Sequence, residues 1–302
     1  MSTNCTLDTC DISESLYGYR PNVGVNVFFA FVYITIDAYC IYLFTKRRGW
    51  IGYTVSVLLG ALLELIGYAS RVLGYSNPFL RMAWIIQYSS LTIAPVFTTA
   101  ATYVCIGHVA EYLGRGAFDI NPKLYLRLFI TSDVFALGIQ SGGGGLSFGE
   151  TPSASGGITL GQGIVIGGLI IQVISLSTFL VLFMGVVWPS NIIRPKTFGP
   201  ANQKEKKLRT FVLILFTAII LIIGRSIFRV IEFSEGFSGS IVHNQKLFIV
   251  FDGFPIAIAS TLMVVFHPMD RVPTTPRFPI VTSEELIIMP YEALRGGGPT
   301  RV

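Results

Sequence analysis

A carboxylate, an amide and four consecutive glycines lie close together in one apolar stretch of the chain. Asp133 and Gln140 are seven residues apart in the segment SDVFALGIQSGGGG, whose last four glycines are residues 142–145. Side chains seven apart lie on the same face of a helix. An ionisable side chain inside a long apolar segment is costly and is by default a candidate for a functional role. The segment therefore predicts a polar site inside a helical bundle.

Other apolar stretches carry similar side chains. Glu64 and Arg71 are seven apart, and Arg225, Arg229 and Glu232 follow an i, i+4, i+7 spacing, so each set occupies one helix face. We expect these groups to form a charge-balanced cluster inside the bundle, open to the exoplasmic side. The candidate substrate-binding residues are Asp133, Gln140, Glu64, Arg71, Gln87, Arg225, Arg229, Glu232 and Asp252.

A purely structural role is the alternative for each of these residues. Polar contacts between membrane helices contribute about 0.6 kcal/mol on average and can simply hold helices together. For any single residue the two interpretations stay open. For the cluster as a whole, the number of ionisable groups favours a binding cavity.

Composition identifies the elements that must position these side chains. The 302 residues are 52% hydrophobic and 13% charged, whereas soluble domains carry roughly 25% charged residues. Apolar runs of about 20 residues, the length that crosses a bilayer, recur throughout. Because only helices satisfy their backbone within one lipid-embedded segment, we predict an all-α polytopic membrane protein, a seven-transmembrane-helix bundle. The predicted spans are 23–45, 50–70, 84–108, 124–146, 161–188, 210–231 and 247–267.

The distribution of basic residues predicts the orientation. Lysine and arginine are concentrated after the first, third and fifth spans, whereas the fourth loop carries only Glu150. The positive-inside rule then predicts an exoplasmic N-terminal segment (1–22), a membrane domain (23–268) and a disordered cytoplasmic tail (269–302). The sequon at Asn4 agrees with an exoplasmic N-terminus and is a candidate glycosylation site. A disulfide between Cys5 and Cys10, on the same side, stays open.

Glycine and proline suggest close packing and local distortion. Gly138 with Gly142, and Gly163 with Gly167, have the small-xxx-small spacing that lets helices approach closely, within one bundle or between two copies, so a homo-oligomer stays open. The four glycines at residues 142–145 allow either close packing or unwinding of the last turn of the fourth span, and both stay open. Proline at 95 and 255 is expected to kink the third and seventh spans and free carbonyl groups.

Several classes of function are disfavoured. The histidines fall near the ends of three different segments and do not converge, which argues against a seven-span zinc hydrolase. No GxxxxGK[ST] loop occurs, so the chain carries no ATPase of its own. The net charge of +5 lies in short loops and does not predict nucleic-acid binding. We expect neither an enzyme nor a bound cofactor or metal.

The ordered motifs resemble the fungal lipid-translocating exporter family, also called the RTA-like or aminocholesterol-resistance family. They are YGYRPNVGVNVFF, LLELIGYASR, IQYSSLTIAPVFTTAATYV, SDVFALGIQSGGGGL, GRSIFRVIEFSEGFSG and FIVFDGFPIAIASTLMVVFHP. The resemblance covers roughly residues 17–270. The family often has an acidic residue, commonly as His-Glu, before the last span, where this chain has His243-Asn244-Gln245.

The resemblance implies a seven-helix fungal protein that exports or flips sphingoid long-chain bases or other toxic amphiphiles. The plasma membrane is the preferred location, although the endoplasmic reticulum or the vacuole satisfies the same topology. A cationic amine suits a carboxylate in an apolar bundle, so Asp133, Glu64 and Asp252 are expected to pair with the amine. Arg225 and Arg229 are expected to balance charge or contact a phosphate or hydroxyl. A receptor-like sensor that regulates lipid asymmetry and stress resistance is the alternative.

Overall fold

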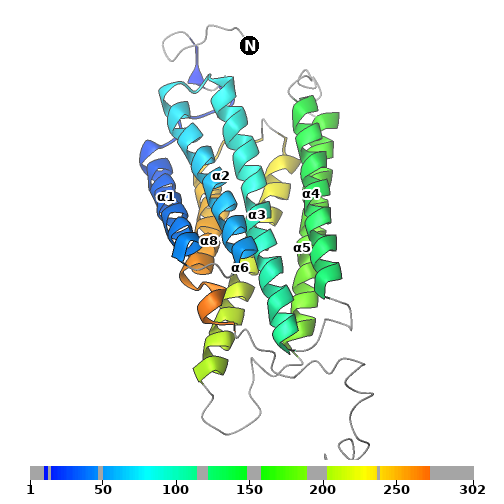
Figure 1. The fold of residues 1–302 in the computed structure, drawn as a ribbon. Coiled ribbons are helices and arrows are strands. Elements are labelled where there is room, and N and C mark those ends of the chain that lie inside the picture. Colours follow the sequence, from blue (N-terminus) through cyan, green and yellow to red (C-terminus); the bar gives the residue numbers. More distant parts are fainter. Residues whose placement is uncertain are drawn as a thin grey trace, which may run out of the picture.

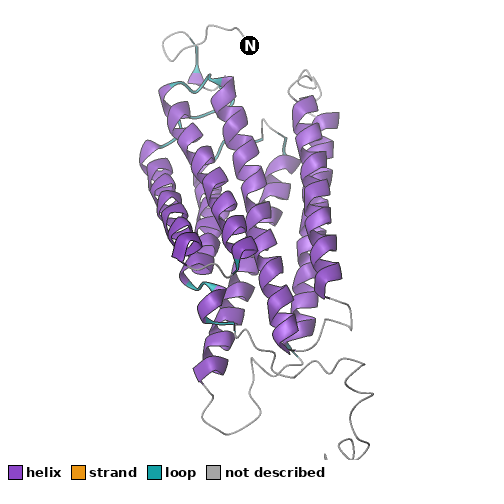
Figure 2. Ribbon diagram, viewed as in Figure 1, coloured by secondary structure: helices purple, strands orange, loops and turns teal. Residues whose placement is uncertain are grey.

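The protein is a bundle of long helices. The computed structural model describes residues 10–12, 15–46, 50–113, 122–147, 158–188, 203–236 and 239–272, and all regular structure within these ranges is helical (Figures 1 and 2). The elements are α1 (Val23–Lys46), α2 (Ile51–Ser76), α3 (Arg81–Leu113), α4 (Pro122–Ser147), α5 (Leu160–Val187), α6 (Gln203–Ser234), α7 (Gln245–Leu247), η3 (Phe248–Gly253), α8 (Phe254–Val265) and η4 (Pro268–Asp270).

Six helical segments are long and apolar enough to cross a membrane: α1, α2, α3, α5, α6 and the continuous run α7–η3–α8. The prediction of helices in all seven stretches is confirmed, with ends displaced by up to seven residues. The 26-residue α4 is not among these six apolar segments. Its polar side chains and glycines lower its hydropathy, although its length of about 39 Å, at 1.5 Å per residue, is sufficient. The chain is a multi-pass membrane protein.

The helices form two lateral groups joined by a central pair. Figure 1 shows α1, α2 and α8 on one side, α4 and α5 on the other, and α3 and α6 between them. α2 packs mainly on α1 and α3, and α4 packs mainly on α5. A core of fully buried aromatic and aliphatic residues extends through the bundle, including Phe29, Tyr103, Phe179 and Phe211. The arrangement brings the polar faces of α2, α3, α6 and η3 together.

Several predictions for the termini fall wholly or partly outside the described residues. These are the sequon at Asn4, the thiol of Cys5 and nearly all of the C-terminal tail. Cys10 is disulfide-bonded, whereas Cys40 and Cys105 are free.

The glycine-rich segment of α4 remains helical, so of the two possibilities the structure has close packing and not unwinding. α4 continues through all four glycines to Ser147. The reason is close packing on α5: a Cβ on Gly143 would lie 2.7 Å from the Gly161 carbonyl oxygen and 2.8 Å from the Val165 amide nitrogen. The two backbones therefore approach where neither residue has a side chain, and this packing supports the helix.

The prediction of small-residue packing between helices is confirmed, but the predicted glycines do not make the contact. A Cβ on any of Gly138, Gly142, Gly163 or Gly167 would meet no atom within 4 Å. The contact is made instead by Gly143, Gly161 and Gly168. Spacing alone identified the right helix pair but not the face, because neighbouring glycines in both helices offer the same spacing at several registers.

Alanine at position 143 is expected to destabilise the bundle, whereas alanine at 142 is not. The Gly143→Ala side chain would press on the α5 backbone, and overpacking of this kind costs about 1–3 kcal/mol. Gly142→Ala meets open space and gains up to about 1 kcal/mol of helix propensity. Unfolding of the two purified variants by titration with SDS measures the difference. Equal stabilities would contradict the α4–α5 contact.

Candidate polar site at one end of the bundle

A buried ion network joins α6 to the π-helix η3. Arg225 Nε donates to Asp252 Oδ1 at 2.7 Å. Arg229 Nη2 donates to the other carboxylate oxygen at 3.4 Å, and its Nε lies 2.8 Å from Oδ1 as an ion pair without hydrogen-bond alignment. Arg229 Nη1 also donates to Glu232 Oε2 at 2.8 Å. All four residues are at most 5% exposed, so two guanidinium groups share one buried carboxylate.

Proline at 95 supplies one more partner for this network. Because proline has no amide hydrogen, the carbonyl four residues earlier in α3 lacks its usual helical donor. That carbonyl belongs to Leu91, and it accepts a hydrogen bond from Arg225 Nη2 at 2.7 Å. The expectation that Pro95 frees a carbonyl is therefore confirmed, and the freed group anchors α3 to α6.

The π-helix places Asp252 beside the arginines. Pro255 cannot donate an amide to Phe251, and directly before it the chain adopts π geometry, with the Phe254 amide donating to the Ile249 carbonyl. The wider turn is packed tightly: a Cβ on Gly253 would lie 2.9 Å from both Phe29 Cζ and the Tyr68 hydroxyl oxygen. Single-turn π-helices occur frequently at functional sites. Periodicity in the sequence could not have revealed this one.

Two ionisable residues of α2, Glu64 and Arg71, have different partners. Glu64 is 3% exposed and interacts electrostatically with Arg225, Asp252 and Arg229. Arg71 has neutral partners instead: its Nε donates to Asn26 Oδ1 at 3.0 Å and its Nη2 to the Tyr19 hydroxyl at 2.7 Å. Three carboxylates and two arginines therefore form a cluster around the stripe predicted in the sixth span, whereas Arg71 makes no ion pair with it among the described residues.

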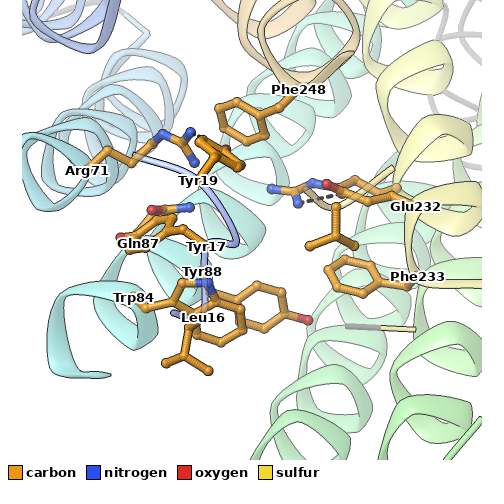
Figure 3. A pocket seen from close by; sticks show the side chains of 12 residues that line it. Leu16, Tyr17, Tyr19, Arg71, Trp84, Gln87, Tyr88, Glu232, Phe233 and Phe248 are labelled. Carbon is orange, nitrogen blue, oxygen red and sulfur yellow. Dashed lines mark hydrogen bonds and ion pairs between the residues drawn. The ribbon is translucent and has the colours of Figure 1, made fainter. Parts of the chain in front are cut away.

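A small hollow lies at the end of the bundle that carries the N-terminal segment. Figure 3 shows Arg71 on the α2 side and Glu232 on the α6 side, with Tyr19 and Phe248 between them. Ligand sites typically combine such apolar walls with a few polar groups. The wall consists of Leu16, Tyr17, Tyr19, Arg71, Trp84, Gln87, Tyr88, Arg229, Glu232, Phe233, Val242 and Phe248.

The N-terminal segment closes over this hollow. Gly18 has a φ of 66°, which favours glycine, and a Cβ there would lie 2.7 Å from the His243 ring. Arg20 stacks 3.8 Å above the Tyr75 ring and donates to the Tyr75 carbonyl at 3.1 Å. Burial raises the pKa of Tyr17 to about 12, an effect partly offset by Arg71, so its phenol stays a hydrogen-bond donor at physiological pH.

Four of the nine predicted site residues therefore line the hollow: Arg71, Gln87, Arg229 and Glu232. Three more, Glu64, Arg225 and Asp252, belong to the adjoining network. Sequence reasoning missed the aromatic wall and the lid formed by Tyr17 and Tyr19. The YGYR motif before the first span was the available signal, because tyrosines and an arginine directly before a membrane helix can fold back over its end.

Asp133 and Gln140 lie elsewhere, between α3, α4 and α5, and do not line the hollow. Asp133 Oδ2 accepts from the Tyr103 hydroxyl at 2.7 Å and from Thr99 Oγ1 at 3.4 Å. Gln140 Nε2 donates to Gln172 Oε1 at 3.1 Å. Spacing put Asp133 and Gln140 on one face correctly, but that face meets α3 and α5 rather than the arginines of α6. The expected single cluster is thus two separate polar groups.

Comparison with known proteins finds relatives in yeast. The chain is 27% identical over 308 residues to the sphingoid long-chain base transporter RSB1 of Saccharomyces cerevisiae, covering 90% of this chain and 80% of the relative. It is 30% identical over 200 residues to protoporphyrin uptake protein 1 of the same yeast (66% and 63% covered), and 27% identical over 222 residues to yeast protein RTM1 (73% and 69%). No solved structure matches.

The matched region contains the ion network and most of the hollow. A family model described as RTA1 like protein matches residues 57–275, from α2 to just past η4. Glu64, Arg71, Asp133, Arg225 and Asp252 all fall within this range. The chain belongs to the RTA1-like protein family.

Proposed function

We propose that the protein is a translocator of amphiphilic lipids that works without ATP, with sphingoid long-chain bases or similar toxic amphiphiles as substrates. The observation that carries the proposal is the hollow, which combines a carboxylate, an amide and aromatic rings beside a buried ion network. The similarity to a protein named as a sphingoid long-chain base transporter supports this substrate class.

The chemistry of the hollow suits a cationic headgroup. An ammonium group can pair with the carboxylate of Glu232, and the faces of Phe233, Phe248 and Tyr19 attract cations as well. Arg225 and Arg229 would balance the carboxylates when the site is empty. Glu64 and Asp133 are the further carboxylates that a headgroup crossing the bundle could meet, and Gln140 is an additional hydrogen-bonding group beside Asp133.

We further propose seven membrane spans, α4 included, with an exoplasmic N-terminus, a cytoplasmic C-terminus and a location in the plasma membrane. In this orientation the hollow faces the exoplasmic side. The positive-inside distribution supports the orientation, because Lys46, Lys206 and Lys207 all lie at the opposite end of the helices. Attachment of glycan to Asn4 is part of the same proposal.

Reconstitution of the purified chain into liposomes tests the function. With a fluorescent long-chain base in the inner leaflet, we expect protein-dependent appearance of the base in the outer leaflet without nucleotide. Liposomes that contain the Glu232→Gln variant are expected to show slower movement, since the variant lacks one carboxylate of the hollow. Saturable binding of the base without any movement would contradict translocation and favour the receptor-like sensor instead.

A further inference from the structure

Arg71 is a buried cation without an acidic partner in the part of the chain that the structure describes. Its guanidinium is 2% exposed, donates to Asn26 and Tyr19, and lies 4.2 Å from the Phe248 ring centroid. Arginine offers five N–H donors, and these two bonds use two of them. Burying a charge is costly unless it is paired. The remaining donors line the hollow, so the position suits an anionic group brought by a ligand.

Two further polar groups of the hollow lack partners among the described residues. The Tyr17 hydroxyl and Gln87 Oε1 are both buried and make no hydrogen bond there. Buried polar atoms in native structures are nearly always hydrogen-bonded. The phenol can donate to an anion, and the amide oxygen can accept from an ammonium or hydroxyl group. The hollow therefore offers binding groups for both charges.

The opposite wall supplies the second charge. Glu232 uses Oε2 in its pair with Arg229, and its side chain faces the hollow. Arg71 and Arg229 lie 4.2 Å and 5.7 Å from the same Phe248 ring centroid, so their guanidinium carbons are at most about 10 Å apart. One small headgroup can therefore span from Arg71 to the Arg229–Glu232 pair.

We propose that the hollow binds the headgroup of a zwitterionic amphiphile, with its oxoanion, such as a phosphate ester, on Arg71 and Tyr17 and its ammonium group on Glu232 and Gln87. This inference deepens the proposed function and rests on it for the lipid nature of the ligand. It specifies that an amine alone fills only half of the site. Guanidinium–phosphate contacts are strong because they are charge-assisted and often bidentate.

Equilibrium binding to the full-length protein in detergent tests the proposal. The probes are a short-chain sphingoid base, its 1-phosphate ester and inorganic phosphate. Trp84 lines the hollow, so its fluorescence reports binding in a background in which Trp50 and Trp188 are replaced by phenylalanine. We expect the ester to bind about tenfold or more tighter than the base, and inorganic phosphate to bind much more weakly than the ester.

Variants separate the two halves of the site. Arg71→Gln is expected to abolish the preference for the ester while leaving the affinity for the base within about twofold. Arg71→Lys keeps the positive charge but loses the bidentate guanidinium donors, so its preference for the ester should lie between those of the unmodified protein and Arg71→Gln. Glu232→Gln should lower the affinity for both the base and the ester, because both carry the amine, and should keep the preference for the ester. Lys246→Gln removes an exposed charge at the same end of the bundle, outside the hollow, and should change neither.

The possible outcomes test the oxoanion site separately from the proposed translocator function. Equal affinity for base and ester, or a preference that survives in folded Arg71→Gln and Arg71→Lys proteins, would overturn the oxoanion site even if liposomes show translocation. Binding of inorganic phosphate as tight as that of the ester would overturn the lipid headgroup as its occupant. An Arg71-dependent preference for the ester without transbilayer movement would support the site and contradict only the translocator.

Discussion

Replacing Asp252 with asparagine is expected to destabilise the folded bundle by about 3–5 kcal/mol, because it removes the one carboxylate that two buried guanidinium groups share. Asparagine keeps the size of the side chain and can still accept one hydrogen bond. Among the described residues, Arg225 keeps its hydrogen bond to the Leu91 carbonyl and Arg229 keeps its pair with Glu232, while Glu64 is the other carboxylate that interacts with both arginines. The stability of detergent-purified protein, measured by SDS titration, gives the difference.

Two controls show whether the loss of stability in Asp252→Asn comes from the lost charge or from the lost contacts. Glu111→Gln breaks a pair with His108 in which both side chains are 49% exposed, and exposed pairs contribute only about 0–1 kcal/mol. The double variant Arg225→Gln, Asp252→Asn removes one charge of each sign, so it is expected to recover part of the loss. A single-variant loss no larger than that of Glu111→Gln would contradict a network under electrostatic control.

Hydropathy was sufficient to predict the helices but not to establish that each one spans the membrane. The limits of α1, α4 and α5 lie within two residues of their predictions. α3 and α6 extend further, because helix formation continues past the apolar segment into polar turns such as the one that contains Lys206 and Lys207. In α4, the same polar residues that made the segment a functional candidate lower its hydropathy.

Side-chain spacing predicted which residues share a helix face, but not which faces meet. The stripe of Arg225, Arg229 and Glu232 does form one network with Asp252. Asp133 shares no contact with it, because α4 packs on α5 through Gly143 and turns its polar face toward Tyr103 of α3. The rotation of a helix about its axis depends on tertiary packing, which a single sequence does not specify.

The backbone features of the site were only partly predictable. Proline indicated that carbonyl groups would be freed, but the donor that fills the Leu91 carbonyl comes from α6, 134 residues later in the chain. The lid of Tyr17 and Tyr19 depends on the N-terminal segment folding back between α2 and α7, where the Asn22 amide donates to Gln245 Oε1 at 3.3 Å. Contacts between such distant segments leave no periodic pattern in the sequence.

Replacing Asp133 with asparagine is expected to slow translocation strongly while leaving the fold intact. Asp133 is 2% exposed and makes no ion pair in the described part of the chain; its partners are the hydroxyl groups of Tyr103 and Thr99. Both can still donate to the amide oxygen of asparagine, so stability should change little. An unpaired carboxylate inside a bundle is costly, and under our proposal it persists because it receives the ammonium group or a proton during transport.

Loss of one partner of a buried charge pair costs about 2–5 kcal/mol, so we expect transbilayer movement of a fluorescent long-chain base to slow by roughly 30-fold or more. In cells, Asp133→Asn should abolish resistance to long-chain bases at unchanged surface expression. Asp37→Asn is the matched control, because it makes the same change at a buried carboxylate of α1, away from the hollow and from Tyr103. Asp37→Asn should leave movement unchanged. Normal movement in Asp133→Asn liposomes would reduce Asp133 to a structural contact between α3 and α4 and leave the hollow as the remaining candidate for the substrate site.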